Sequence, residues 1–174
     1  VSTENAGEFS SAIKGETLED TIRIISGYVD TIVMRHNVEG SAKIAAAVSP
    51  VPIINAGDGA GEHPTQGLLD MYTIKKELGK LDGLKIAVAG DLLYGRASRS
   101  LIHLLSSYKN QITLVSPPQL KFPEEHKKLY GNGMKFIESN DLAGIAQTVD
   151  VLYMTRIQKE RFASEAEYLK LKGS

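Results

Sequence analysis

Three arginines in this sequence follow short apolar runs, and their side chains suit the binding of small anions. Arg35 follows the run TIVM, and Arg156 follows the run VLYMT. Arg96 follows the loop GDLLYG, which comes after the apolar run IAVA. A guanidinium group offers two parallel hydrogen bonds to the two oxygens of a carboxylate or phosphate. One such arginine is most often part of a surface ion pair, but three at equivalent positions predict a site for anionic ligands.

The segment GEHPTQG adds a histidine and a glutamine to this set. Pro64 suits the first turn of a helix, so His63 directly precedes an expected helix N-terminus, where the helix dipole favours anions and a neutral imidazole. A neutral imidazole can donate its N–H to a carbonyl oxygen and polarise that carbonyl for attack. Gln66, one turn further on, is expected to face the same pocket. Taken alone, His63 would be read as a helix-capping residue.

The loop GDLLYGRAS lacks the parts of a nucleotide-binding loop. A phosphate loop of the form G-x-x-x-x-G-K-[ST] needs a lysine and then a hydroxyl, and this chain has Arg96 and Ala97 at those positions. No G-x-G-x-x-G fingerprint, His-x-x-x-His pair, carboxylate cluster or serine–histidine–acid arrangement is visible. We therefore expect no metal and no cofactor.

Composition excludes several classes of partner. The 174 residues include 20 Lys and Arg, 21 Asp and Glu and no cysteine, for a net charge of -1. This balance predicts no nucleic-acid surface, and no apolar run approaches the roughly 20 residues of a membrane helix. We expect a soluble, cytoplasmic protein. The first residue is not methionine, so the chain is expected to be a piece of something longer.

Apolar runs rich in β-branched residues alternate with helical patterns, which favours parallel sheets flanked by helices. The sequence predicts an α/β protein of two doubly wound parallel-sheet domains, 1–79 and 80–174, with helix 64–78 as the link. Ligands bind such sheets beyond the carboxyl ends of the strands. An ordinary domain of this class without a site is the alternative at this point. Strands are expected at 31–34, 51–55, 85–89, 111–115, 134–137 and 151–153, and helices after the cap Thr17 and at 38–48, 64–78, 96–107, 123–130 and 141–146.

Several segments together resemble the catalytic chain of the aspartate carbamoyltransferase family. They are KGETLEDT, MRH, INAGDGAGEHPTQGLLDMYTI, GDLLYGR and LYMTRIQKERF, in this order and over nearly the whole sequence. HPTQ alone indicates only the wider carbamoyltransferase family, whereas the segments that contain arginine favour the aspartate branch. The resemblance implies the carbamoyltransferase fold, with 1–79 as the end of the carbamoyl phosphate-binding domain and 80–174 as an incomplete aspartate-binding domain.

The resemblance also implies a reaction and roles for residues. The amine of L-aspartate would attack carbamoyl phosphate, giving N-carbamoyl-L-aspartate and phosphate in pyrimidine biosynthesis. The implied catalytic residues are His63, Arg35 and Lys14. The family's site is shared between the subunits of a homotrimer, and a regulatory chain or fused pathway enzymes are possible partners. Carried onto this chain, the carbamoyl phosphate contacts are Arg35, His63 and Gln66, the aspartate contacts are Lys14, Arg96, Arg156 and Gln158, and Ser10 lies on the mobile loop that carries Lys14.

The chain departs from the family pattern in three ways. A Ser-x-Arg-Thr phosphate loop would precede Val1, and a His-Pro-Leu-Pro segment would follow Ser174. The chain by itself is therefore expected to be inactive. Ala97 also replaces the usual threonine. Two alternatives remain open, namely a non-catalytic structural or regulatory module and a carbamoyltransferase for another amino acid such as ornithine.

Overall fold

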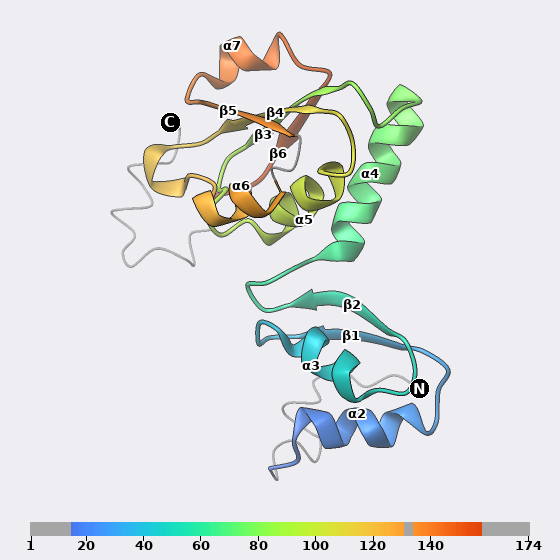
Figure 1. Cartoon of the computed structure of the whole chain (residues 1–174). Coiled ribbons are helices and arrows are strands. Elements are labelled where there is room, and N and C mark those ends of the chain that lie inside the picture. The colour runs from blue at the N-terminus through green and yellow to red at the C-terminus, as the bar shows by residue number, and fades with distance from the viewer. Residues whose placement is uncertain (1–14, 131–133, 158–174) are drawn as a thin grey trace. The chain divides into compact units, whose positions relative to one another are not determined.

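The computed structural model describes residues 15–130 and 134–157, which form two compact units (Figure 1). The units are Val1–Thr65 and Gln66–Ser174. Both contain parallel strands covered by helices, which confirms the predicted parallel α/β fold. No helix in the described part of the chain is long and apolar enough to cross a bilayer.

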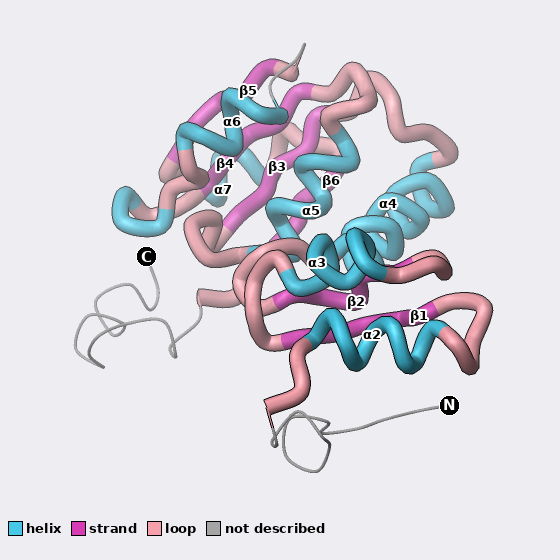
Figure 2. The backbone as a smooth tube through the Cα atoms, turned by 60° about the horizontal axis from the view of Figure 1, so that its bottom comes forward, coloured by secondary structure: helices cyan, strands magenta, loops and turns pink. Residues whose placement is uncertain are grey.

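The first unit consists of a two-stranded parallel sheet with both helices packed on one face (Figure 2). Ile32 and Met34 alternate along the first strand and pack with Ile22 and Ala45 from the helices, while Val33 between them is 66% exposed. This alternation is the period of two that a sheet with one covered face requires. In chain order the elements are α2 (Leu18–Ser26), β1 (Ile32–His36), α3 (Ser41–Val48) and β2 (Ile53–Asp58).

Both strands of this unit are longer than the apolar runs that predict them. β1 includes Arg35 and His36, and β2 extends to Asp58, because the pairing resumes as His36↔Asp58 after an irregularity in the register. The predicted N-cap of α2 is confirmed, since the Thr17 hydroxyl accepts the Asp20 N–H at 3.2 Å. α3 begins later than predicted, at Ser41, because Gly40 adopts a left-handed conformation with φ of 82°.

The second unit is a four-stranded parallel sheet in the order β5-β4-β3-β6. Alternate residues of β3 (Lys85–Ala89), the first strand of this unit in sequence, face opposite layers of helices. Ile86 and Val88 pack with residues of α4, α5 and α6, whereas Ala87 and Ala89 pack against α7. The elements are α4 (Pro64–Leu78), β3 (Lys85–Ala89), α5 (Arg96–Leu105), β4 (Gln111–Val115), the short 3-10 helix η2 (Pro118–Leu120), α6 (Glu124–Tyr130), β5 (Lys135–Ser139), α7 (Leu142–Ala146) and β6 (Val151–Met154).

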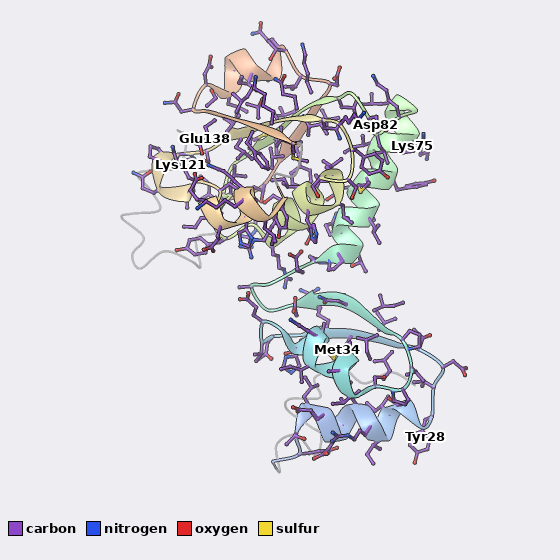
Figure 3. All side chains as sticks on the ribbon, in the orientation of Figure 1. Tyr28, Met34, Lys75, Asp82, Lys121 and Glu138 are labelled. Atoms are coloured by element: carbon purple, nitrogen blue, oxygen red, sulfur yellow. The ribbon has the colours of Figure 1, made fainter. Side chains whose placement is uncertain are left out.

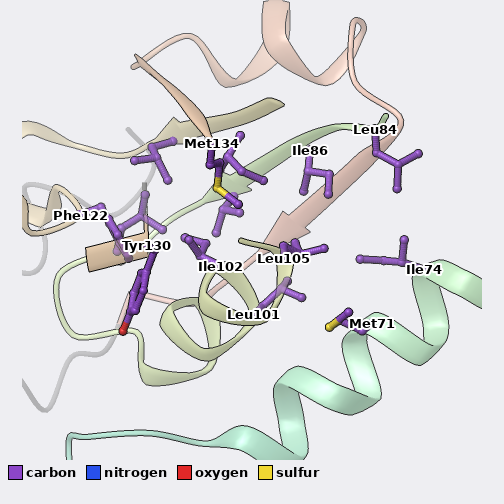
Figure 4. Close-up of a cluster of buried hydrophobic side chains, with 14 residues drawn as sticks. Met71, Ile74, Leu84, Ile86, Leu101, Ile102, Leu105, Phe122, Tyr130 and Met134 are labelled. Atoms are coloured by element: carbon purple, nitrogen blue, oxygen red, sulfur yellow. The ribbon is translucent and has the colours of Figure 1, made fainter. Parts of the chain in front are cut away.

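Helix α4 packs within the second unit through the face that carries Met71 and Ile74 (Figure 4). These side chains belong to the same buried cluster as Leu84, Leu101 and Leu105. The division between compact units accordingly falls between Thr65 and Gln66, earlier than residue 79. The domain boundary after Gly79 stays a prediction.

Charged side chains gather on the surface of the second unit, where Lys121 and Glu138 lie together (Figure 3). Glu138 also pairs with Lys127, which in turn pairs with Glu124. Hydrogen bonds from Lys121 and Lys127 lower the pKa of Glu138. Surface ion pairs of this kind contribute little to stability.

Asn110 holds the entry to β3. Its buried side chain accepts the Leu84 N–H at 3.0 Å and donates to the Leu81 carbonyl at 2.9 Å.

We predict that Asn110→Ala lowers the free energy of unfolding by about 2 kcal/mol, because it leaves two backbone groups without their partner. Urea denaturation followed by circular dichroism measures this loss. The exposed neighbour Lys109→Ala is the control, and equal effects of the two variants would contradict the assignment.

Candidate active site

In the first unit, the carboxyl ends of β1 and β2 form one edge that carries two of the predicted residues. Arg35 is exposed near the end of β1. The loop after β2 returns over the same strand end, since the Gly59 N–H donates to the His36 carbonyl at 2.8 Å. That loop leads to His63. The parallel pairing thus explains why Arg35 and the segment that carries His63 belong to the same edge of the sheet.

Asp58 organises this edge from a buried position, with only 6% of its surface exposed. Its Oδ2 accepts the Gly40 N–H at 2.9 Å, and its Oδ1 accepts the Glu62 N–H at 2.8 Å. Burial raises the pKa of Asp58, but hydrogen bonds from Glu62, Asn55 and Gly40 outweigh it and lower the pKa overall. The Asp58 carboxylate therefore fixes the loops after both strands.

His63 precedes α4 directly and is half-buried. Its Nδ1 lies 3.4 Å from the Thr65 hydroxyl, at the long end of hydrogen-bonding distance. The role of His63 as an imidazole before a helix N-terminus stays a prediction.

In the second unit, neighbouring strands carry the loops with the other two arginines. β3 pairs with β6 in parallel, with Ala89 opposite Met154. The Thr155 N–H donates to the Ala89 carbonyl at 2.8 Å. Arg96 begins α5 after the β3 loop, and Arg156 follows Thr155. Both arginines thus come after the carboxyl ends of adjacent strands; Arg96 is half-buried and Arg156 is exposed.

Gly90 permits these two strand ends to approach closely. Its φ of 112° is one that side chains disfavour, and a Cβ there would lie 2.1 Å from the Thr155 carbonyl oxygen. Glycine is the only residue that fits this contact without a shift of the backbone. The first glycine of GDLLYGR, Gly90, is thus explained by close packing between the β3 and β6 strand ends.

Gln66 lies in the first turn of α4 and is held by its neighbours in the second unit. Its Nε2 donates to Asp70 Oδ1 at 2.9 Å, one helical turn further on. The adjacent Gly67 packs against α5, where a Cβ would lie 2.9 Å from the Leu104 side chain. Asp70 also interacts with Tyr153 of β6, two residues before Thr155. Gln66 is therefore linked to the same strand that leads to Arg156.

Sequence reasoning missed Asp70 and Tyr153. The spacing of Gln66 and Asp70 at i and i+4 on a predicted helix was an available signal, because such pairs hydrogen-bond on helix surfaces. No local pattern indicates Tyr153, whose contact with Asp70 depends on the packing of α4 near β6.

A cavity of about 450 Å³ lies at the carboxyl ends of the second sheet. Gly90, Pro117, Leu142 and Thr155 are among its walls, which are largely apolar. Arg96 and Arg156 do not line it, although Thr155 and Ile157 do. Such walls do not supply the cations that small acids require, so this cavity does not by itself provide the predicted anion site.

Three predicted site residues, Ser10, Lys14 and Gln158, lie outside the described ranges. Within 15–130 and 134–157, no group of three or more histidine, aspartate or glutamate side chains is arranged to hold a metal ion.

Comparison with known proteins decides the family. The description "Aspartate/ornithine carbamoyltransferase, Asp/Orn binding domain" matches residues 82–173, and "Aspartate/ornithine carbamoyltransferase, carbamoyl-P binding domain" matches residues 1–76. This chain belongs to the aspartate/ornithine carbamoyltransferase family. The resemblance predicted from the sequence is confirmed.

Relatives within this family share about half of the aligned residues with the chain. The chloroplastic aspartate carbamoyltransferase of Arabidopsis thaliana is 54% identical over 169 residues, which cover 96% of this chain and 43% of the relative. The aspartate carbamoyltransferase catalytic subunit of Methanocaldococcus jannaschii is 53% identical over 167 residues, which cover 95% of this chain and 55% of the relative. The chain thus spans about half the length of these relatives.

Solved structures of the family agree with the fold. The catalytic subunit of M. jannaschii aspartate transcarbamoylase matches with a TM-score of 0.83 and 52% identity, over 95% of this chain and 55% of that one. The Trypanosoma cruzi aspartate transcarbamoylase in complex with carbamoyl phosphate and aspartate matches with a TM-score of 0.85 and 44% identity, over 98% and 55%.

We predict that Asp58→Asn lowers the free energy of unfolding at neutral pH by about 1–3 kcal/mol, because charge-assisted hydrogen bonds become neutral ones. The lowered pKa of Asp58 makes its contribution present above the ordinary value of 3.8 and lost as the pH falls through the folded-state pKa. The difference between wild type and variant should therefore shrink in acid.

Urea denaturation of the full-length protein at pH 7 and pH 3 measures this difference. Asp30→Asn, at an exposed carboxylate of the same unit, controls for the change of charge. A difference that stays constant between the two pH values would contradict the role of the Asp58 carboxylate.

Gly90→Ala tests the close contact between the two strand ends. We predict a loss of at least about 2 kcal/mol of stability, since the strained φ adds to a clash with backbone. Gly83→Ala is a matched control, because Gly83 has a φ of +68° and nothing within 4 Å of its Cβ position. In thermal denaturation, the melting temperature of Gly90→Ala should lie well below that of Gly83→Ala. Equal melting temperatures would refute the contact.

Proposed function

We propose that the protein containing this chain transfers the carbamoyl group of carbamoyl phosphate to the amine of L-aspartate. The main support is identity of about 53% with relatives named aspartate carbamoyltransferase, over nearly all of this chain. Arg35, His63, Gln66, Arg96 and Arg156 are all present in the segments that carry the resemblance. The products are N-carbamoyl-L-aspartate and phosphate, and the reaction serves pyrimidine biosynthesis.

The chemistry suits a site built from cations and one imidazole. The amine nitrogen of aspartate attacks the carbonyl carbon, a C–N bond forms, and the C–O bond to phosphate breaks as the amine loses a proton. His63 and Arg35 stabilise the negative charge that develops on the carbonyl oxygen, and each donor of this kind contributes about 3 to 4 kcal/mol in other enzymes. Holding amine and carbonyl in attack geometry supplies about 7 kcal/mol or more.

The remaining residues divide between the two substrates. Gln66 joins Arg35 and His63 at carbamoyl phosphate. Arg96 and Arg156 bind the aspartate carboxylates through paired N–H groups, and their positions after adjacent strands β3 and β6 support this role. Lys14 and Gln158 complete the aspartate site, and Ser10 belongs to the loop that carries Lys14.

The assembly and location are part of the same proposal. We infer a homotrimer in which the loop with Lys14 reaches a neighbouring subunit's site, with a regulatory chain or fused pathway enzymes as further partners. The proposed location is the cytoplasm, although several plant relatives are named chloroplastic. The domain roles are carbamoyl phosphate binding for 1–79 and aspartate binding for 80–174.

Two other functions are less well supported. Ornithine carries a second amine, which the arginines would repel. A non-catalytic module would have no need to keep charged residues in the segments that carry the resemblance, since decay of a site removes such residues first.

We predict that the full-length protein forms carbamoyl aspartate from carbamoyl phosphate and aspartate and gives no product with ornithine. Arg96→Ala should raise the KM for aspartate about 10- to 100-fold, the cost of hydrogen bonds between charged groups. Colorimetric measurement of the ureido product gives the rate with each amino acid and the KM for aspartate. Arg23→Ala, an exposed arginine paired with Asp20, should leave the kinetics unchanged. Turnover of ornithine, or an unchanged KM in Arg96→Ala, would contradict the proposal.

A further inference from the structure

The side chain of Gln66 is oriented by a carboxylate on its own helix. Its Nε2 lies 2.9 Å from Asp70 Oδ1, one turn along α4. An ionised carboxylate only accepts hydrogen bonds, so Asp70 requires the amide nitrogen of Gln66 to face it and the amide oxygen to face away. A glutamine without such a neighbour presents either atom to a ligand. Asp70 thereby selects one of the two orientations.

Asp70 is itself held in place by its surroundings. Its second oxygen, Oδ2, is buried and lacks a partner of good hydrogen-bond geometry among the described residues. Tyr153 of β6 lies next to this carboxylate. Burial, the negative charge of Asp70 and a hydrogen bond to it raise the pKa of Tyr153 to about 12. Asp70 is thus flanked by Gln66 on its own helix and by Tyr153 of β6.

We propose that Asp70 is a positioning residue that makes the Gln66 amide oxygen a hydrogen-bond acceptor for the carbamoyl NH2 group. This inference rests on the proposed function, in which Gln66 contacts carbamoyl phosphate. It adds a basis for specificity, since an amide oxygen accepts from an NH2 group and repels a carboxylate oxygen at the same place. The site therefore distinguishes a carbamoyl group from a carboxyl group of the same shape.

Phosphonoacetate is a suitable probe of this distinction. It carries a carboxylate where carbamoyl phosphate has its carbonyl and amino groups, and it has no carbamoyl group to transfer. In Asp70→Asn, the new side-chain amide can donate to the Gln66 oxygen, so the Gln66 amide can turn and offer its nitrogen to a ligand. The substitution should then favour phosphonoacetate and disfavour carbamoyl phosphate.

The experiment measures the KM for carbamoyl phosphate and the inhibition constant of phosphonoacetate with the full-length enzyme. We expect Asp70→Asn to shift the ratio of the two constants about 10-fold towards phosphonoacetate, the effect of exchanging one favourable polar contact for an unfavourable one. A residue that only supports the fold would weaken both ligands together. A parallel loss for both, or an unchanged ratio, would overturn the inference.

A double-mutant cycle separates orientation from simple loss of charge. In a Gln66→Ala background, Asp70→Asn should change the ratio by less than about 2-fold, because the residue through which Asp70 acts is absent. If the full shift persists in that background, the carboxylate acts directly on anions and the inference is wrong. Glu77→Gln, an exposed site on the same helix, removes the same charge and should leave the ratio unchanged.

Two further outcomes are informative. If Asp70→Asn does not fold, Asp70→Ser provides the same test, since a hydroxyl also donates or accepts. Turnover by the wild-type enzyme with normal kinetics but no shift in the variants would overturn the role of Asp70 alone. Absence of carbamoyl transfer in the wild-type enzyme would overturn the proposed function, and this inference with it.

Discussion

Close backbone contact between the ends of β3 and β6 determines the arrangement of the second unit's candidate site. Gly90 lies so near the Thr155 carbonyl that a side chain at this position would meet it at 2.1 Å. The parallel pairing of β3 with β6 produces this approach. Arg96 follows the loop after β3, and Arg156 lies two residues after the end of β6.

Helix α4 connects packing with chemistry in a single element. Its buried face, with Met71 and Ile74, joins the core of the second unit, and Gly67 permits close contact with α5. These contacts hold the first turn, and Asp70 then orients Gln66 within it. The orientation of the Gln66 side chain thus depends on apolar packing one or two turns away, as expected when a site is built on a rigid element.

The sequence predicts the fold class, the order of elements and most of their bounds, because apolar periodicity reports which faces are buried. α4, β3 and β4 agree with the predicted ranges, since proline, glycine and β-branched runs mark them clearly. β1 and β2 extend further than predicted because backbone pairing resumes at the polar residues His36 and Asp58. Hydrogen bonding between strands, unlike burial, leaves no trace in residue type.

The roles of the site residues stay predictions. Arg35, His63, Arg96 and Arg156 were predicted because strand ends are recognisable and the segments around them resemble one family. Asp70 and Tyr153 were not found because their role arises from contacts between α4 and its neighbours, which sequence order does not reveal. The clash that reserves position 90 for glycine likewise involves a residue 65 positions away.

In the proposed function, two arginines after adjacent strands bind the carboxylates of one amino acid while Gln66 accepts a hydrogen bond from the carbamoyl group. A crystal structure of the full-length protein with carbamoyl phosphate and succinate, a dicarboxylate without the attacking amine, tests this arrangement. We expect the guanidinium groups of Arg96 and Arg156 to pair with the succinate carboxylates and the Gln66 oxygen to face the carbamoyl nitrogen. Succinate bound elsewhere, with both arginines turned to solvent, would contradict it.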